Sequence, residues 1–198
     1  EDALSHIKAD VFSIMTVLDK DQEVVFCTAG DLRTSFHAAV RAANDVFAVP
    51  LKRRFDVVIS VARSPMDINL YQAQKAIDNG ALAVVDGGVL ILVASCWDGV
   101  GDRAYLDLLG SAATPQEALD KIAAGYKLGY HKAAKIAEAA KRLRLVAYSE
   151  LDGTTLKKAF IEKTDFLQES IDIALASRGP GAKVAVLTDG TLTVPIIA

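Results

Sequence analysis

The sequence predicts an α/β protein with a doubly wound, mostly parallel β-sheet flanked by helices and an N-terminal β-hairpin. Short runs rich in valine, isoleucine and leucine alternate with segments of helical periodicity, which is typical of parallel strands joined by covering helices. The 198 residues are 52% hydrophobic and 24% charged, as in folded globular proteins. The chain also begins with two β-rich segments separated by a short polar turn. We treat residues 1–198 as a single α/β domain.

The first expected elements are a hairpin and a long helix. Residues 11–18 alternate apolar and small side chains, residues 19–22 are turn-like, and residues 23–28 are again β-rich. In residues 32–47, apolar side chains recur at helical spacing, and Pro50 lies just beyond them. We therefore expect two antiparallel strands followed by a helix.

The rest of the chain alternates expected strands and helices. The strands are residues 56–62, 89–95, 145–148 and 183–187. The helices are residues 69–78, several segments between 102 and 142, then 155–161 and 166–176. Three glycine-containing segments are expected to punctuate them: Asn79-Gly80 as a helix end, Asp86-Gly87-Gly88 as a tight turn into a strand, and Gly179-Pro180-Gly181 as a turn.

Charge, cysteine usage and hydropathy exclude several classes of protein. The formal charge of −3, from 22 basic and 25 acidic residues, produces no field that would attract nucleic acid or an anionic membrane. Cys27 and Cys96 are far apart and lack metal-ligand spacing, so neither a disulfide framework nor a zinc site is indicated. The longest apolar runs are only of strand length, and no signal peptide opens the chain. We expect a cytoplasmic protein, and the start at Glu1 without methionine fits a piece of a longer one.

Polar residues follow each expected strand of the parallel sheet. Ligands of open parallel sheets bind at the carboxyl ends of the strands, so these residues are the first candidates. They are Arg63, Ser64, Asp67 and Asn69 after the first strand, Ser95 to Asp98 after the second, Ser149 and Glu150 after the third, and Thr188 and Asp189 after the fourth. Capping of the following helices explains such residues equally well, and Asp67 is the expected N-cap of the next helix.

The helix after Asp67 is amphipathic. Three apolar residues form one stripe: Leu70, Ala73 and Ile77. Gln72 and Lys75 fall together on the opposite face, with Asn69 beside them. An amide next to an ammonium can hold a small carboxylate or hydroxyl, because the ammonium supplies charge and the amide both donates and accepts. Side chains on such a face are otherwise simply solvated.

Glycines and histidines give weaker signals. The Gly99-x-Gly101 turn lacks the third glycine of a dinucleotide fingerprint, and Asp98 would repel phosphates, so a plain backbone turn is favoured. The three histidines, His6, His37 and His131, lie on separate elements without metal-ligand spacing, so no metal site is expected within this chain. His131 heads a helix whose cations are interpreted as a solvated face: Lys132, Lys135, Lys141 and Arg142.

Six motifs together resemble the nickel-dependent lactate racemase family. They are Asp56-Val57-Val58-Ile59-Ser60, Asp67-Ile68-Asn69-Leu70-Tyr71-Gln72-Ala73-Gln74-Lys75-Ala76, Gly87-Gly88-Val89-Leu90-Ile91-Leu92-Val93-Ala94, Asp98-Gly99-Val100-Gly101, Leu128-Gly129-Tyr130-His131-Lys132-Ala133 and Ala182-Lys183-Val184-Ala185-Val186-Leu187. The resemblance covers nearly the whole chain, but only the second, C-terminal domain of the family's two.

The resemblance implies an isomerase that racemises or epimerises 2-hydroxy acids. In that family a nickel pincer nucleotide (nickel pyridinium-3,5-bisthiocarboxylic acid mononucleotide) takes a hydride from the substrate's C2 and returns it to either face. The residues that hold this cofactor, and the histidines that act as general bases, belong to the family's first domain. This chain alone is therefore expected to be inactive and to bind no nickel, with the N-terminal domain of the same protein as its partner.

The family's Gln-x-x-Lys pair, which orients the substrate, matches Gln72 and Lys75. The resemblance thus implies that Lys75 pairs with the substrate carboxylate and that Gln72 fixes the orientation. Asn69 and His131 are further candidates for the substrate site. Ala62-Arg63 stands where relatives usually carry glycines, which favours a larger or more acidic 2-hydroxy acid, or a sugar-like substrate, over lactate, with Arg63 as a second anion contact.

Two alternatives from other functional classes remain open. One is a non-catalytic binding or interaction module with the same fold. The other is an independent nucleotide-binding domain. The presence of the family's catalytic histidines and lysine upstream of Glu1 would distinguish the enzyme from the non-catalytic module. Titration of the chain with ATP or NAD would test the nucleotide-binding domain.

Overall fold

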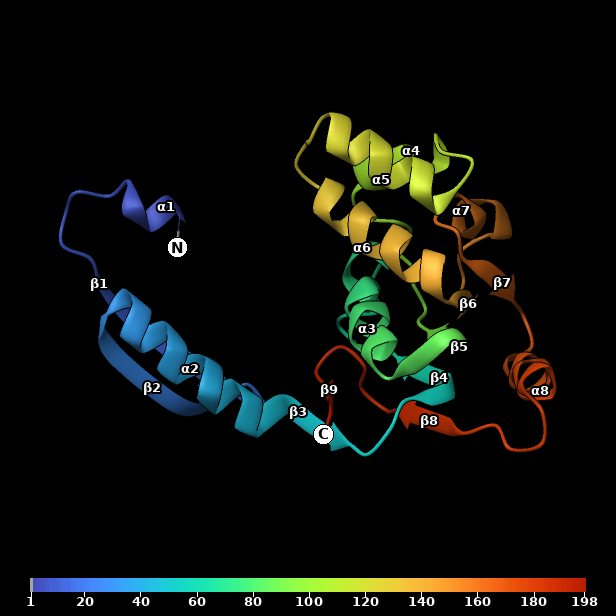
Figure 1. Cartoon of the computed structure of the whole chain (residues 1–198), viewed down its shortest axis with the longest axis horizontal. Helices are drawn as coiled ribbons and strands as arrows, with labels where there is room; N and C mark the ends of the chain where they lie inside the picture. The colour runs from blue at the N-terminus through green and yellow to red at the C-terminus, as the bar shows by residue number, and fades with distance from the viewer. Residues whose placement is uncertain (1) are drawn as a thin grey trace. The chain divides into compact units, whose positions relative to one another are not determined.

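The computed structural model describes residues 2–198, which divide into two units (Figure 1). One unit ends at Ala48, and the other is Val49–Ala198. That residues 1–198 act as a single domain stays a prediction. No helix within the described residues is long and apolar enough to cross a membrane.

The first unit contains the expected hairpin and long helix. After the short helix α1 (Asp2–Ser5), strands β1 (Phe12–Leu18) and β2 (Val24–Asp31) pair in antiparallel fashion, and α2 (Leu32–Phe47) follows. The carboxylate of Asp31 accepts the backbone N–H of Thr34 at 2.9 Å and so caps α2. The boundaries predicted for α2 are confirmed.

The second unit is built on a five-stranded parallel sheet, which confirms the α/β class. Its strands are β4 (Phe55–Val61), β5 (Val84–Val93), β6 (Arg144–Tyr148), β7 (Glu162–Thr164) and β8 (Val184–Leu187). They are arranged in the order β7-β6-β5-β4-β8, and every neighbouring pair is parallel. A separate two-stranded sheet joins β3 (Ala48–Leu51) to β9 (Val194–Ile197).

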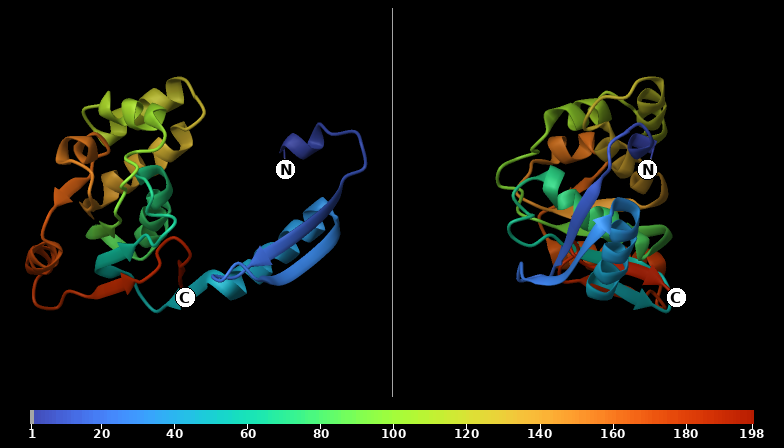
Figure 2. Two further views of the ribbon diagram at one scale, coloured as in Figure 1. Left: turned by 180° about the vertical axis from the view of Figure 1, so that it is seen from behind. Right: turned by 90° about the vertical axis from the view of Figure 1, so that its left-hand side faces the viewer.

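Helices cover both faces of the parallel sheet. They are α3 (Leu70–Leu82), α4 (Arg103–Gly110), α5 (Pro115–Ala124), α6 (Tyr130–Arg142), α7 (Gly153–Lys158) and α8 (Leu167–Arg178). The larger core cluster contains residues of the five helices α3, α4, α5, α6 and α7 together with Val58 and Leu90 of the sheet. The smaller cluster joins α8 with Val57 and Ile91. Because successive side chains of a strand point to opposite faces, this cluster lies on the other face of the sheet. Figures 1 and 2 show α8 apart from the other helices. Fully buried β-branched and leucine residues therefore alternate between two cores, which explains why these strands appear continuously apolar in the sequence.

The predicted helix end at Asn79-Gly80 is wrong, because α3 continues to Leu82. A Cβ at Gly80 would lie 2.8 Å from Leu90 Cδ1 and 3.1 Å from Ser60 Cβ, so glycine is needed here for close packing of α3 on the sheet. Asn79 remains helical, and its Nδ2 donates to the carbonyl of Gly190 at 2.8 Å. Both residues thus serve contacts distant in sequence rather than a helix cap.

The second expected strand also starts earlier than predicted. Strand β5 begins at Val84, and Asp86-Gly87-Gly88 lies inside it as an irregularity rather than in front of it. Gly87 has φ +72°, and the pairing with β4 shifts register between Phe55 and Val57. The positive φ identifies a bulge, for which glycine is suited.

Candidate functional site

The start of α3 is held by the loop that follows β5. Asn69 is the N-cap, and its Oδ1 accepts the N–H of Gln72 at 3.0 Å. The N–H groups of Leu70 and Tyr71 donate to the carbonyls of Gly99 and Val100 at 3.1 and 3.0 Å. The first three amides of the helix are therefore satisfied within the protein. An anion beside this helix must be bound by side chains instead.

The prediction that Asp67 caps α3 is wrong. Asn69 directly precedes the first helical residue and has the extended backbone, φ −151° and ψ 167°, of an N-cap. The carbonyl of Asp67 instead accepts the N–H of Cys96 at 2.7 Å. Its half-buried carboxylate has no hydrogen-bond or ion-pair partner within residues 2–198.

The glycine turn after β5 serves this same junction. Gly99 and Gly101 have φ +79° and +84°, and a Cβ at Gly101 would lie 2.9 Å from Asn69 Oδ1. The turn presents carbonyl groups to α3, whereas a phosphate-binding loop presents N–H groups. Its geometry thus agrees with a backbone turn that fixes α3.

The amphipathic arrangement predicted for α3 is confirmed. The three residues of the apolar stripe are fully buried: Leu70, Ala73 and Ile77. On the other side, Gln72 is half-buried and Lys75 is exposed. The Lys75 ammonium lies 3.4 Å from the sulfur of Met66, and no carboxylate within the described chain pairs with it. We call Asn69, Gln72 and Lys75 the α3 face; their role in substrate binding stays a prediction.

The structure gives the other two sequence candidates no shared polar contact with this face. Arg63 is exposed, and its carbonyl accepts the N–H of Met66 at 2.7 Å. His131 is exposed near the start of α6, where its Nδ1 lies 3.2 Å from the hydroxyl of Tyr126. The roles suggested for Arg63 and His131 likewise stay predictions.

Lys132 contradicts the interpretation of the α6 cations as a purely solvated face. Its side chain is half-buried against α3, and its ammonium donates to the carbonyl of Tyr71 at 3.1 Å. Arg142 is half-buried too, and it donates to the carbonyl of Val84 at 2.9 Å. Only Lys135 and Lys141 of this group are exposed. Gln74 Nε2 also donates to the carbonyl of Lys132 at 2.8 Å. The positions of these two residues in the sequence do not predict this contact between α3 and α6.

A second polar region lies at the carboxyl ends of β4, β5 and β6. It is a cavity of about 420 Å³, which we call the carboxyl-edge pocket. Apolar side chains at the strand ends line it, together with five polar residues: Asp67, Ser95, Ser149, Glu150 and Asp165. Four of these five follow strands predicted from the sequence. Asp165 follows β7, which the sequence analysis did not predict.

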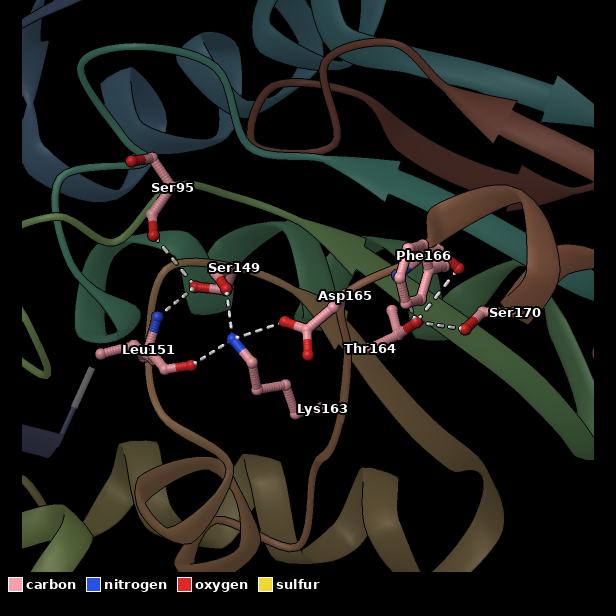
Figure 3. Close-up of polar contacts among 8 residues, drawn as sticks. All are labelled: Ser95, Ser149, Leu151, Lys163, Thr164, Asp165, Phe166 and Ser170. Atoms are coloured by element: carbon pink, nitrogen blue, oxygen red, sulfur yellow. Dashed lines mark hydrogen bonds and ion pairs between the residues drawn. The ribbon is translucent and has the colours of Figure 1, made fainter.

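Hydrogen bonds join most polar groups of this pocket to one another. Ser95 Oγ donates to Glu150 Oε1 at 2.5 Å, and Ser149 Oγ donates to the carbonyl of Ser95 at 3.0 Å. The Lys163 ammonium donates to the carbonyls of Ser149 and Leu151, both at 2.9 Å, and lies 3.2 Å from the carboxylate of Asp165. Figure 3 shows these three contacts around the ammonium. These contacts hold the loop after β6 to strand β7.

Cys96 follows Ser95 on the loop after β5 but is unsuited to nucleophilic catalysis. Its side chain is 2% exposed and its φ is +56°. Burial, with smaller contributions from the charges of Asp67 and Glu150, raises the pKa of the thiol to about 11. The thiol is therefore protonated at neutral pH, and the thiolate is the reactive form.

The donor sets within residues 2–198 do not fit a nickel ion. No three histidine, cysteine, aspartate or glutamate side chains of the described residues lie close enough together to hold a metal. In the carboxyl-edge pocket, Glu150 accepts from Ser95 and Asp165 pairs with Lys163, so these carboxylates do not form one ligand cluster.

Known proteins resemble this chain in sequence and in fold. A protein named lactate racemase from Lactiplantibacillus plantarum is 27% identical over 187 residues, covering 90% of this chain and 43% of that protein. Another lactate racemase, from Thermoanaerobacterium thermosaccharolyticum, is 29% identical over 111 residues, covering 56% of this chain and 26% of that protein. The chain therefore spans less than half the length of these relatives.

Solved structures share the fold. The lactate racemase apoprotein from Thermoanaerobacterium thermosaccharolyticum superposes with a TM-score of 0.85 at 23% identity, covering 93% of this chain and 46% of that one. A Thermotoga maritima protein gives a TM-score of 0.65 at 10% identity, covering 99% of this chain and 51% of that one. In sequence, the family described as "Lactate racemase C-terminal domain" matches residues 51–196. This match spans the parallel sheet, the α3 face and the carboxyl-edge pocket, so the chain belongs to the lactate racemase C-terminal domain family.

Proposed function

We propose that this chain is the substrate-facing domain of a 2-hydroxyacid racemase or epimerase, in which Lys75 binds the substrate carboxylate and Gln72 orients the 2-hydroxyl. The α3 face carries the proposal. The first backbone amides of α3 are already bonded, yet the ammonium of Lys75 and the side-chain amide of Gln72 have no oxygen partner within the described chain. Two donors are thus available on adjacent turns of a rigid helix.

Lys75 supplies the positive charge for a carboxylate bound beside the first turns of α3, because the first three amides of the helix are already bonded. The same charge stabilises the substrate as its hydroxyl loses a proton. Gln72 both donates and accepts, which suits a hydroxyl next to a carboxylate.

The proposal places the cofactor and the general bases outside this chain. A nickel pincer nucleotide held by an N-terminal domain of the same protein would supply acceptance and return of the C2 hydride. Since the described residues offer no ligand set for nickel, their part is limited to binding and orienting the substrate. A cytoplasmic location belongs to the same proposal, and the free thiols Cys27 and Cys96 suit a reducing compartment.

Arg63 determines the proposed substrate class. Arg63 is exposed and lies two residues after the end of β4, on the segment that leads to α3. A second cation near the α3 face favours a 2-hydroxy acid that carries a further anionic or hydroxyl group, since guanidinium groups bind such oxygens well. Malate and gluconate are two simple representatives of these acids.

The test is an isomerase assay on the full-length protein prepared with its cofactor. Single enantiomers or epimers of lactate, malate and gluconate are incubated, and the configuration at C2 is followed by chiral chromatography. We expect inversion at C2, faster for malate or gluconate than for lactate. Absence of inversion for every member of this panel would contradict the proposal.

Reaction in D2O tests the hydride step. If the hydrogen leaves C2 as a hydride and returns, the product keeps protium at C2. Proton abstraction to solvent would instead place deuterium there. Nuclear magnetic resonance of the product distinguishes the two, and deuterium at C2 would sink the hydride mechanism.

A further inference from the structure

Lys132 makes three contacts with α3, although it belongs to α6. Its ammonium donates to the carbonyl of Tyr71 at 3.1 Å and lies 4.9 Å from the centroid of the Tyr71 ring. Its own carbonyl accepts Nε2 of the fully buried Gln74 at 2.8 Å. The backbone and the side chain of Lys132 are thus both tied to the first two turns of α3.

This position is costly for a cation. Burial lowers the pKa of Lys132, the nearby charge of Asp78 opposes that shift, and the charges of Lys75 and Lys135 add to it. The Asp78 carboxylate forms its ion pair with Lys135, at 3.5 Å, and no carboxylate of the described chain pairs directly with Lys132. A half-buried ammonium with only a carbonyl and a ring as partners is a candidate for a functional role.

The Tyr71 carbonyl, which Lys132 bonds, also affects the position of Lys75. In an α-helix the carbonyl of residue i accepts the N–H of residue i+4, so the Tyr71 carbonyl is also the acceptor for the Lys75 amide. Tyr71 directly precedes Gln72 in the chain. The Lys132 contact therefore acts on the turn that connects the two substrate-facing residues.

We propose that Lys132 is a positioning residue that holds the first turn of α3 so that Gln72 and Lys75 meet the substrate in one fixed geometry. The ammonium fixes the Tyr71 carbonyl and ring, and Gln74 fixes α6 against the same turn. This role rests on the proposed function of the α3 face.

The experiment compares three variants of the full-length, cofactor-loaded protein on the fastest substrate of the panel above. Lys132→Met keeps the apolar stem and removes the charge and the donor. Lys132→Arg keeps both the charge and a donor. Lys135→Met is the matched control, because Lys135 is an exposed cation of the same helix whose partner is Asp78.

We expect Lys132→Met to raise KM about tenfold while kcat stays within about threefold, because misplacing a binding group weakens ground and transition states alike. Lys132→Arg should restore KM to within about threefold of the wild-type value, and the control should leave KM and kcat within about twofold. A merely structural anchor would instead reduce the active fraction, which lowers kcat and leaves KM unchanged. That pattern, or an unchanged KM in folded Lys132→Met, overturns the proposal.

Two additions keep the result decisive. If Lys132→Met does not fold, Lys132→Gln replaces it, since it also removes the charge and shortens the reach but remains polar; the same rise in KM is expected. Lys75→Ala separates the two proposals. Near-normal kcat/KM in Lys75→Ala refutes the α3 face as the substrate site. Loss of activity in Lys75→Ala together with an unchanged KM in Lys132→Met refutes only the role of Lys132.

Discussion

The carboxyl-edge pocket and the α3 face are both polar, but their polar groups differ in what they bond. Beside the pocket, Lys163 contacts two carbonyls and the carboxylate of Asp165. Within it Ser95 donates to Glu150, and of the pocket carboxylates Asp67 alone has no partner in the described chain. On the α3 face, the nearest partner of the Lys75 ammonium is a thioether. Groups that satisfy one another stabilise the fold, whereas unsatisfied donors on a fixed scaffold are available to a ligand. The first region is therefore expected to matter for stability and the second for activity.

Lys163→Met should produce the largest loss of stability among these variants. The side chain of Lys163 is 24% exposed, and its removal leaves the carbonyls of Ser149 and Leu151 without their donor. We expect the free energy of unfolding to fall by about 2–3 kcal/mol, as for other buried charged hydrogen bonds. Urea denaturation of the chain measures this value. A loss below about 0.5 kcal/mol would show that the network does not stabilise the fold.

Alkaline pH should destabilise the protein through Cys96, which is buried on the loop after β5. The folded-state pKa of about 11 lies above the ordinary thiol pKa of 9.0, because burial disfavours the thiolate. The stability that the neutral thiol contributes is thus complete below pH 9 and is lost as the pH rises towards 11, by about 2 kcal/mol for one group. Denaturation midpoints between pH 8 and 11 measure the loss, and Cys96→Ala should reduce its slope. An identical slope in that variant would contradict the assignment.

Asn69→Ala should cost less than either of these changes. The substitution removes the acceptor for the Gln72 amide, and loss of a helix N-cap typically costs about 1 kcal/mol. Asp67→Ala is the matched control, because its carboxylate bonds no amide of α3 within the described chain. Thermal unfolding should show a lower Tm for Asn69→Ala only. A larger decrease in Tm for Asp67→Ala than for Asn69→Ala would mean that Asp67 caps α3 after all.

Lys75→Ala should have the smallest effect on stability. The ammonium is exposed and forms no ion pair within the described residues, so we expect a change of less than about 0.5 kcal/mol. Urea denaturation next to Lys163→Met gives the comparison directly. A loss as large as that of Lys163→Met would mean that both lysines are structural.

Much of the framework could be predicted because it depends on local periodicity. The apolar stripe of α3, the continuous valine and isoleucine strands and the opening hairpin each leave a pattern within a few residues. Fold class and the placement of Gln72 and Lys75 opposite the buried stripe follow from such patterns. The assignment of a function to these two residues came from family resemblance.

The errors concern contacts between residues distant in sequence. Asp67 and Asn69 are equally good caps by residue type. The loop after β5 fixes the first residue of α3 and therefore which of the two is its N-cap. The residue type of Gly80 predicts a helix end, but its role is to allow close contact with Leu90 of β5, which is distant in sequence. The sequence around Lys132 is typical of a solvated helix face, and only the packing of α6 on α3 brings its ammonium to the Tyr71 carbonyl. The three-residue strand β7 is too short for a periodic signal.

The activity of Lys75→Ala tests the central claim most directly. In the full-length, cofactor-loaded protein, kcat/KM for C2 inversion is measured for wild type, Lys75→Ala and Lys135→Ala, with circular dichroism to verify the fold. We predict a decrease of about 100-fold or more for Lys75→Ala, since a charged contact to the substrate carboxylate is lost, and a change within about twofold for Lys135→Ala. A folded Lys75→Ala variant with kcat/KM within threefold of wild type would contradict the account.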